Sequence, residues 1–288
     1  MRHVTNVLPE NEEAQRAWDG VLFERFAKYK HLIVASLAQH GTAAMRRFPP
    51  AQGARVVDVG CGFGDSTLQL AELVGAEGSA LGVDISPRFI EAAREEANVP
   101  NVRFEVMDVQ ASQFDDEFDY AFSRFGTMFF ASPVAALRNV RAALTDDGRL
   151  VMVVWRRRED NPWMYVAEQL VKPLIEIPEE TDEPRCGPGP FSMAGPDTVS
   201  AQLQAAGFDE IAFLRLDIPN KLGNTLDEAI EMNLSLGPAA EAVRLAGDEG
   251  ESMKPYLRDL LRPALEQFVT DDGVWGMASV WIVTASAA

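Results

Sequence analysis

The sequence predicts an α/β fold with a mostly parallel sheet, and three observations lead to this prediction. Between residues 54 and 158, short apolar runs alternate with amphipathic stretches, which is the pattern of strand–helix–strand units. A further strand pattern follows at residues 211–218, after a helix that a glycine ends. The run at residues 275–284 is rich in tryptophan, valine and isoleucine, which suits a last strand better than a helix.

Seven strands are expected in all. They are residues 55–59, 80–84, 102–107, 120–124, 149–155, 211–218 and 275–284. The connections have helical character; Ser86 and Pro87, for example, supply an N-cap and a first-turn proline. Two helical and aromatic insertions, at about residues 159–196 and 222–268, have no place in the basic sheet. We interpret them as a cap over the carboxyl edge of the strands, with a homodimer surface as the alternative.

Composition excludes several classes of protein. The net charge is −18, from 44 acidic and 26 basic residues, so the mean surface field repels a phosphate backbone and nucleic acid is not an expected partner. No window approaches the about 18 to 20 uninterrupted apolar residues of a membrane span, and residues 1–10 lack the pattern of a secretory signal. The two cysteines, Cys61 and Cys186, are too few for a disulfide framework. We therefore expect a cytoplasmic protein with reduced thiols.

A glycine loop at residues 60–64 is the most informative stretch. It lies between the first expected strand and a helix, and its glycines allow positive φ and a close approach of backbone amides to a ligand. Such a loop can bind a polar or anionic cofactor, although glycine also occurs in βα turns simply to turn the chain. The spacing is G-x-G-x-G, with Asp65 where the dinucleotide pattern places its third glycine. This counts against the alternative of an NAD(P)-type oxidoreductase.

Acidic and polar residues follow the next strands. Asp84 ends the second strand, 20 residues after Gly64. At this spacing a carboxylate accepts hydrogen bonds from ribose hydroxyls in nucleotide-binding α/β folds. Asp108 follows the third strand, and Ser123 to Phe125 follow the fourth. Because the carboxyl ends of parallel strands meet at one edge of a sheet, these residues are expected to share one site.

These motifs resemble those of the class I S-adenosylmethionine-dependent methyltransferases, and the stretch from Ser123 to Phe130 is most similar to the ubiquinone and menaquinone C-methyltransferases and the small-molecule group around them. The resemblance implies a Rossmann-like, seven-stranded, mostly parallel sheet with an antiparallel last strand. It also implies a helical lid at residues 1–50, followed by the methyltransferase domain at residues 51–288 with its helical cap insertions.

The cofactor implied by the resemblance is S-adenosylmethionine. In this family an acid such as Asp58 lies near the methionine amino group, and an acid such as Asp84 accepts the ribose hydroxyls. Asp108 with Val109 resembles the pair that binds the adenine amine and ring. The residues expected to bind the cofactor are Trp18, Asp58, Gly60, Cys61, Gly62, Gly64, Asp84, Ile85, Asp108, Val109, Ser123, Arg124 and Phe125.

The expected reaction is transfer of a methyl group to a small, apolar or aromatic molecule, with an O-, N- or C-acceptor left open. A sulfonium carbon is already activated, so positioning and exclusion of water can supply much of the rate. No residue is therefore assigned as catalytic; His31 is the candidate if its helix covers the site, with a solvated histidine as the alternative. The candidates for an acceptor pocket are Phe23, Phe26, Met128, Trp163, Tyr165 and Phe191.

No metal is expected, because Arg124 would repel a cation at the strand where catechol-type enzymes build their metal site. Two further alternatives are open besides the oxidoreductase. One is a regulatory protein that binds the cofactor without turnover. The other is an aminopropyltransferase, which is disfavoured because Asp58 offers an acid for the amino-acid end of the cofactor.

Overall fold

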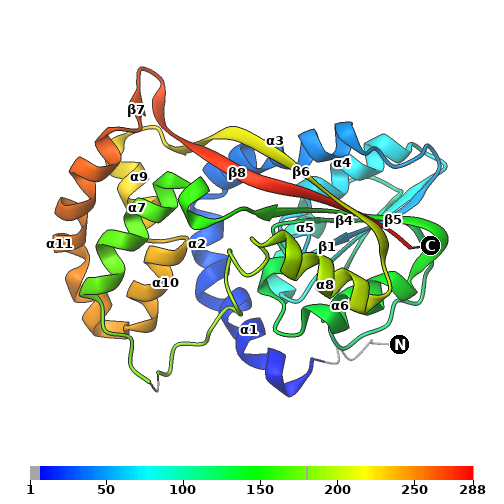
Figure 1. The fold of residues 1–288 in the computed structure, drawn as a ribbon, viewed down its shortest axis with the longest axis horizontal. Coiled ribbons are helices and arrows are strands. Elements are labelled where there is room, and N and C mark those ends of the chain that lie inside the picture. The colour runs from blue at the N-terminus through cyan, green and yellow to red at the C-terminus, as the bar shows by residue number, and fades with distance from the viewer. Residues whose placement is uncertain (1–6, 180, 288) are drawn as a thin grey trace.

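The computed structural model describes residues 7–179 and 181–287. Its centre is one sheet with the strand order β3-β2-β1-β4-β5-β8-β6 (Figure 1). The pairs among β1 to β5 are parallel, whereas β8 is antiparallel to both β5 and β6. This confirms the predicted mostly parallel sheet with an antiparallel last strand. The strands are β1 (Arg55–Val59), β2 (Ser79–Asp84), β3 (Val102–Val106), β4 (Phe118–Arg124), β5 (Leu144–Trp155), β6 (Asp209–Gly223), β7 (Val269–Thr270) and β8 (Gly273–Ser286).

The outer strands β6 and β8 are longer than the sequence pattern predicts. They pair with each other along most of their length and extend beyond the parallel strands (Figure 1). The two-residue strand β7, which was not predicted, pairs with the start of β8. Most of β6 is exposed or half-buried, so its ends lack the apolar alternation by which a strand is recognised in sequence.

Helices cover both faces of the sheet. α4 (Asp65–Val74) and α5 (Pro87–Glu96) lie over β1 to β3, whereas α3 (Lys30–Arg47) contacts α4, β5 and β6. α6 (Pro133–Ala142) and α8 (Pro196–Ala206) pack against each other and lie below the sheet in Figure 1. The central strands are buried on both sides, as the continuous apolar run at residues 150–155 of β5 indicates.

Four helices form a second hydrophobic cluster beside the sheet. They are α7 (Pro162–Val171), α9 (Leu226–Asn233), α10 (Pro238–Leu245) and α11 (Gly247–Glu266). Buried residues such as Val171, Ile230 and Leu261 form its core. We name these four helices the helical cluster. They come from the two segments in which insertions were predicted.

The N-terminal helices lie between the helical cluster and the sheet (Figure 1). They are α1 (Glu12–Ala17), a π-helical turn (Trp18–Leu22), α2 (Phe23–Lys28) and α3. Short 3-10 turns occur at Pro9–Asn11, Thr127–Phe129, Arg158–Asp160 and Lys172–Leu174. Across residues 7–179 and 181–287, no helix combines the length and the apolar character needed to cross a membrane.

Candidate functional site

A cavity of about 630 Å³ lies at the carboxyl edge of the parallel strands. One wall consists of the loops that follow β1, β2, β3 and β4. The opposite wall consists of the N-terminal helices together with α7, α9 and α10 of the helical cluster. The volume is in the range of small-molecule sites, and ligands of open α/β sheets bind at this edge. The cavity is therefore the candidate functional site.

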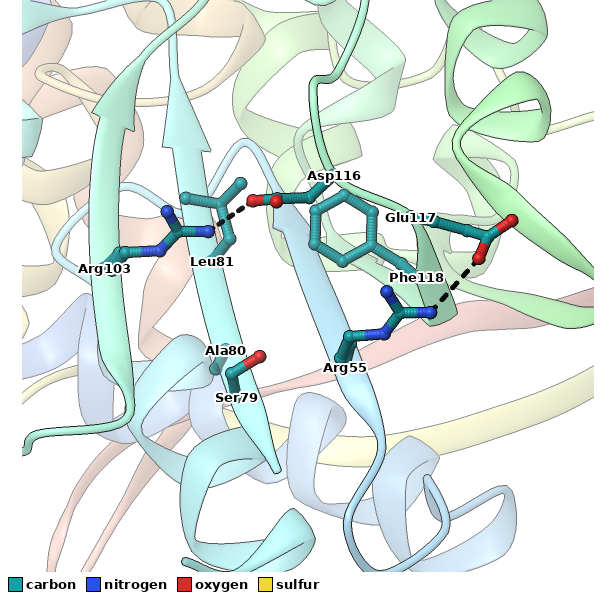
Figure 2. Close-up of a pocket in the computed structure, with 8 residues that line it drawn as sticks. All are labelled: Arg55, Ser79, Ala80, Leu81, Arg103, Asp116, Glu117 and Phe118. Carbon is teal, nitrogen blue, oxygen red and sulfur yellow. Dashed lines mark hydrogen bonds and ion pairs between the residues drawn. The ribbon is translucent and has the colours of Figure 1, made fainter. Parts of the chain in front are cut away.

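A second cavity, of about 70 Å³, lies at the opposite edge, where β1, β2, β3 and β4 begin (Figure 2). Ion pairs line it: Arg103 with Asp116, and Arg55 with Glu117 at 3.3 Å. Its basic side chains are thus already neutralised. It is also far smaller than the usual site for a small molecule.

The glycine loop brings its backbone to the large cavity. Gly60 and Gly62 have φ values of 72° and 53°, and both line the cavity. A Cβ atom on Gly60 would lie 3.0 Å from the Cα atom of Gly126 in the loop after β4. The two loops can therefore approach each other only because both positions lack a side chain.

Asp84 projects into this site from the end of β2. One carboxylate oxygen accepts a hydrogen bond from the Gly62 amide at 3.0 Å, and the other accepts one from the Ser86 amide at 3.0 Å. Burial raises the pKa of this carboxyl group. Each oxygen can accept a further hydrogen bond, so a ligand hydroxyl can still bind.

Asp108 follows β3 and is held by the N-terminal segment. Its Oδ2 accepts a hydrogen bond from Asn11 Nδ2 at 2.7 Å, and its Oδ1 accepts one from the Gln110 amide at 3.0 Å. Ile85 and Val109, next to the two acids, also line the cavity. The acidic residues after β2 and β3 thus lie at one edge, as their positions in sequence predict.

Polar residues of the N-terminal helices dock on this edge, and their contacts were not predicted from the sequence. Asn11, Gln15 and Asp19 are spaced four residues apart, which places them on one side of a helix. Gln15 Nε2 donates to the carbonyl oxygen of Ile85 at 3.1 Å, and Asp19 Oδ1 accepts from Ser86 Oγ at 2.8 Å. The four-residue spacing of these polar residues was the feature of the sequence from which a polar helix face could have been predicted.

A charged pair lies in the cavity wall between the start of α4 and the end of β4. Arg124 donates two hydrogen bonds to Asp65, at 2.7 and 2.9 Å. Beneath this pair, the buried Asp58 accepts hydrogen bonds from Ser66 Oγ and Thr67 Oγ1, both at 2.7 Å. Burial raises the pKa of Asp58 to about 6, and its Oδ1 has no partner among the described residues.

Phe125 adopts a strained backbone conformation beside Arg124. Its φ is 61°, which is rare for a residue with a side chain. Its amide donates to the Val153 carbonyl at 2.9 Å, and its ring stacks on Trp155 with centroids 4.4 Å apart. These contacts hold the ring in the cavity wall, where such strain is often functional.

Comparison with known proteins agrees with this geometry. Residues 50–184 match a family model described as a methyltransferase domain. Residues 50–184 are thus similar to a methyltransferase domain. The resemblance noted in the sequence is thereby confirmed. The chain is 36% identical over 126 residues to aklanonic acid methyltransferase DauC of Streptomyces sp. (strain C5), a match that covers 42% of this chain and 57% of that protein.

A second relative is demethylmenaquinone methyltransferase of Staphylococcus carnosus (strain TM300), 30% identical over 147 residues, or 49% of this chain and 60% of that protein. The chain thus spans about three fifths of the length of these curated relatives. A solved structure of phosphoethanolamine N-methyltransferase 2 from Haemonchus contortus, in complex with S-adenosyl-L-methionine, superposes with a TM-score of 0.57 at 15% identity. That match covers 98% of this chain and 60% of the other, and it shows a shared fold.

Ten of the residues predicted to bind a cofactor line the large cavity. They are Trp18, Gly60, Cys61, Gly62, Asp84, Ile85, Asp108, Val109, Arg124 and Phe125. Asp58, Gly64 and Ser123 do not line this cavity, and their role toward a cofactor stays a prediction. Asp58 is bound by Ser66 and Thr67, and Ser123 Oγ donates to the Val59 carbonyl at 2.8 Å. Gly64 faces Phe104, whose ring would lie 2.6 Å from a Cβ atom there.

Of the residues predicted to form an acceptor pocket, some line the cavity and others do not. Phe26, Met128, Trp163 and Phe191 line the cavity, whereas Phe23 and Tyr165 do not. The Phe23 ring instead packs edge-on against Phe89 at 5.0 Å. Their roles toward an acceptor stay predictions.

His31, the candidate for a catalytic group, is directed away from the cavity. Its exposed side chain lies 3.0 Å from Glu228 Oε1. His40 is the buried histidine: its ring packs edge-on against Phe125 and Trp155, and burial lowers its pKa to about 4. In the described part of the chain, no three potential metal-binding side chains gather in one place, and the expected absence of a metal stays a prediction.

Proposed function

We propose that this chain transfers a methyl group from S-adenosylmethionine to a small organic molecule. One observation carries the proposal: the glycine loop and Asp84 form one wall of a ligand-sized cavity, and aromatic residues from outside the sheet form the other. This arrangement offers a cofactor site and an acceptor site side by side. The match to a methyltransferase domain supports the same reaction class.

The residues present fit the proposed cofactor. Gly60 and Gly62 allow a close approach of the backbone, Asp84 would accept the ribose hydroxyls, and Asp108 with Val109 would hold the adenine. When bound, the cofactor would supply a methyl group on a positively charged sulfur. The protein then needs to position the acceptor in line with that methyl group.

We propose that residues 1–50 act as a lid over this site, preceding a methyltransferase domain at residues 51–288. The contact of Asn11 with Asp108 and that of Asp19 with Ser86 support this role, because they fasten the N-terminal helices to the strand ends that would hold the cofactor. A closed lid excludes water, which strengthens electrostatic interactions in the site. The rate would then come mainly from positioning and desolvation, without a catalytic base.

We further propose an acceptor with an apolar or aromatic body. Phe26, Met128, Trp163 and Phe191 support this, since they present apolar surface to the cavity. The matched relatives act, by their names, on aklanonic acid and demethylmenaquinone. The identity of the O-, N- or C-acceptor stays open.

Calorimetric titration of the protein with S-adenosylmethionine and S-adenosylhomocysteine tests the first step. We expect both to bind and NAD(P) not to bind. Transfer of a radiolabelled methyl group to a panel of aromatic hydroxy, amino and carboxylic acids, with and without EDTA, tests turnover. Failure to bind either cofactor form would refute the proposal, whereas binding without any methylated product would favour a regulatory protein.

A further inference from the structure

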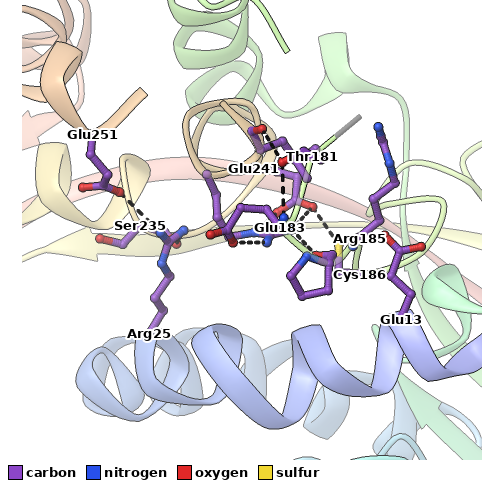
Figure 3. Close-up of polar contacts among 12 residues, drawn as sticks. Glu13, Arg25, Thr181, Glu183, Arg185, Cys186, Ser235, Glu241 and Glu251 are labelled. Carbon is purple, nitrogen blue, oxygen red and sulfur yellow. Dashed lines mark hydrogen bonds and ion pairs between the residues drawn. The ribbon is translucent and has the colours of Figure 1, made fainter. Parts of the chain in front are cut away.

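Arg25 places a guanidinium group in the wall of the cavity, on the side of the helical cluster. It belongs to α2, and its side chain is only 15% exposed. Figure 3 shows it extending from α2 toward Ser235 and Glu251. The sequence analysis did not single out this residue.

The hydrogen-bond donors of Arg25 are largely unused. A guanidinium carries five N–H donors, and here one of them donates to the Ser235 carbonyl at 3.3 Å. Among residues 7–179 and 181–287, the only carboxylate within 4.0 Å is that of Glu251, at 3.8 Å. Glu251 is half exposed and contacts Lys254 more closely, at 2.6 Å. The Ser235 carbonyl and the distant Glu251 therefore leave Arg25 with donors for a further partner.

Neighbouring acids do not supply that partner, because another arginine binds them. Glu241 lines the same cavity, but both its oxygens accept hydrogen bonds from Arg244, at 2.9 and 2.8 Å (Figure 3). Arg244 also donates to Glu183 at 3.0 Å. Burial lowers the pKa of Arg25, which nevertheless stays protonated as arginines do in proteins.

We infer that Arg25 binds an oxyanion of the methyl acceptor, so that the acceptor is a carboxylate-bearing molecule with an otherwise apolar body. This rests on the proposed function, since it assigns an acceptor to the same cavity. A carboxylate can accept two parallel hydrogen bonds from a guanidinium, which matches the unused donors. The adjacent Phe26 and the more distant Trp163 provide apolar surface for the body. The anion would thus be held on the side of the helical cluster, across the cavity from the glycine loop.

A matched pair of probes tests this inference. 2-Naphthoate and 2-naphthamide share the aromatic body and differ in charge. We expect calorimetry to show that the parent protein, with S-adenosylhomocysteine present, binds the carboxylate ~10-fold more tightly than the amide, because charge-assisted hydrogen bonds are lost with the amide. Arg25→Met should abolish this preference, and Arg25→Lys should leave a smaller one. Arg16→Met, at an exposed site of α1 outside the cavity, is the control and should leave it intact.

Equal binding of the two probes by the parent, binding of neither, or a preference that survives in Arg25→Met would overturn the inference. Loss of both probes in Arg25→Met, with an unchanged melting temperature, would assign Arg25 to cavity shape and also overturn it. Two further titrations separate the Arg25 site from the methyltransferase function. One uses S-adenosylhomocysteine alone, and the other repeats the probe titrations without S-adenosylhomocysteine. A protein that discriminates the probes but binds no cofactor would retain the Arg25 site and lose the methyltransferase function.

Discussion

The carboxylate of Asp65 and the guanidinium of Arg124 form a bidentate ion pair in the cavity wall. This pair joins the first turn of α4 to the end of β4. Their side chains are 25% and 11% exposed, so water screens the pair only in part. The acid Asp58 lies close enough to both to influence, and be influenced by, their charges. Removing the arginine would leave two carboxylates near each other without a cation.

We therefore expect Arg124→Met to lower the free energy of unfolding by on the order of 2 to 4 kcal/mol, as for other largely buried pairs that lose one partner. Urea denaturation measures it. The double variant Asp65→Asn/Arg124→Met should recover part of the loss. Arg215→Met, which removes an exposed pair with Asp217, is the control and should leave stability nearly unchanged. Equal effects of the two single variants would contradict this interpretation.

Asp84 is expected to contribute to cofactor affinity. Asp84→Ala should weaken binding of S-adenosylhomocysteine by about 1 to 3 kcal/mol, because hydrogen bonds from the ribose to a carboxylate are lost. Calorimetry is the measurement. Asp84→Asn, which keeps an oxygen acceptor, should lose less affinity. Asp116→Ala, at the opposite edge of the sheet, is the matched control. Unchanged affinity in Asp84→Ala would remove the ribose assignment.

His40 should make stability fall at mildly acidic pH. Burial lowers its pKa from 6.5 to about 4. Between these two pH values His40 is therefore protonated in the unfolded chain and neutral in the folded chain. The stability it contributes is complete above its unfolded pKa and is lost as pH falls toward 4. Between about pH 7.5 and about pH 5 this amounts to about 2 kcal/mol. His40→Leu should lose correspondingly less stability than the parent in urea denaturation at the two pH values; an identical pH dependence would count against a buried neutral ring.

Asp58 should act in the opposite direction over the same pH range. Burial raises its pKa from 3.8 to about 6, so the folded chain binds a proton more readily than the unfolded chain. Its contribution is present below pH 3.8 and is lost as pH rises through 6. Asp58→Asn should therefore gain stability over the parent at about pH 7.5, and this gain should shrink by about 1 to 2 kcal/mol at about pH 5. A gain that is the same at both pH values would show that Asp58 does not titrate there.

Substitutions of Trp163 and Tyr165 test whether α7 contributes to acceptor binding. Trp163 lines the cavity, whereas Tyr165, two residues later on α7, does not. Trp163→Ala should raise the acceptor KM or change acceptor preference with cofactor affinity nearly unchanged, and Tyr165→Ala should leave both unchanged. Trp163→Phe serves if the alanine variant is unstable, since truncating a buried tryptophan costs about 3 to 5 kcal/mol. Sedimentation of the same variants reports on the alternative: a dimer that becomes monomeric with intact kinetics would make this segment an assembly surface.

The mostly parallel sheet and the glycine loop could be predicted because their signals are local. Strand β5, for example, ends in a continuous apolar run at residues 150–155, and the acids at or after the ends of β2 and β3 lie next to the strands in sequence. The ends of β6 and the strand β7 escaped prediction, since their form depends on pairing with β8 rather than on their own pattern. Among the site residues, Asp58 and Ser123 show the same limit, because packing decides whether a side chain near the end of a strand faces the cavity or a neighbouring element.

The sequence by itself determined the parallel sheet, the glycine loop and the edge at which a ligand binds, because these follow from periodicity and spacing along the chain. Only the tertiary structure decided that His40 rather than His31 is buried, that Asn11 reaches Asp108, and that Arg25 lies in the cavity wall. The physical reason is that each of these depends on contacts between segments far apart in sequence. Such contacts form when the helical cluster and the N-terminal helices close over the sheet, and no local pattern of residues specifies them.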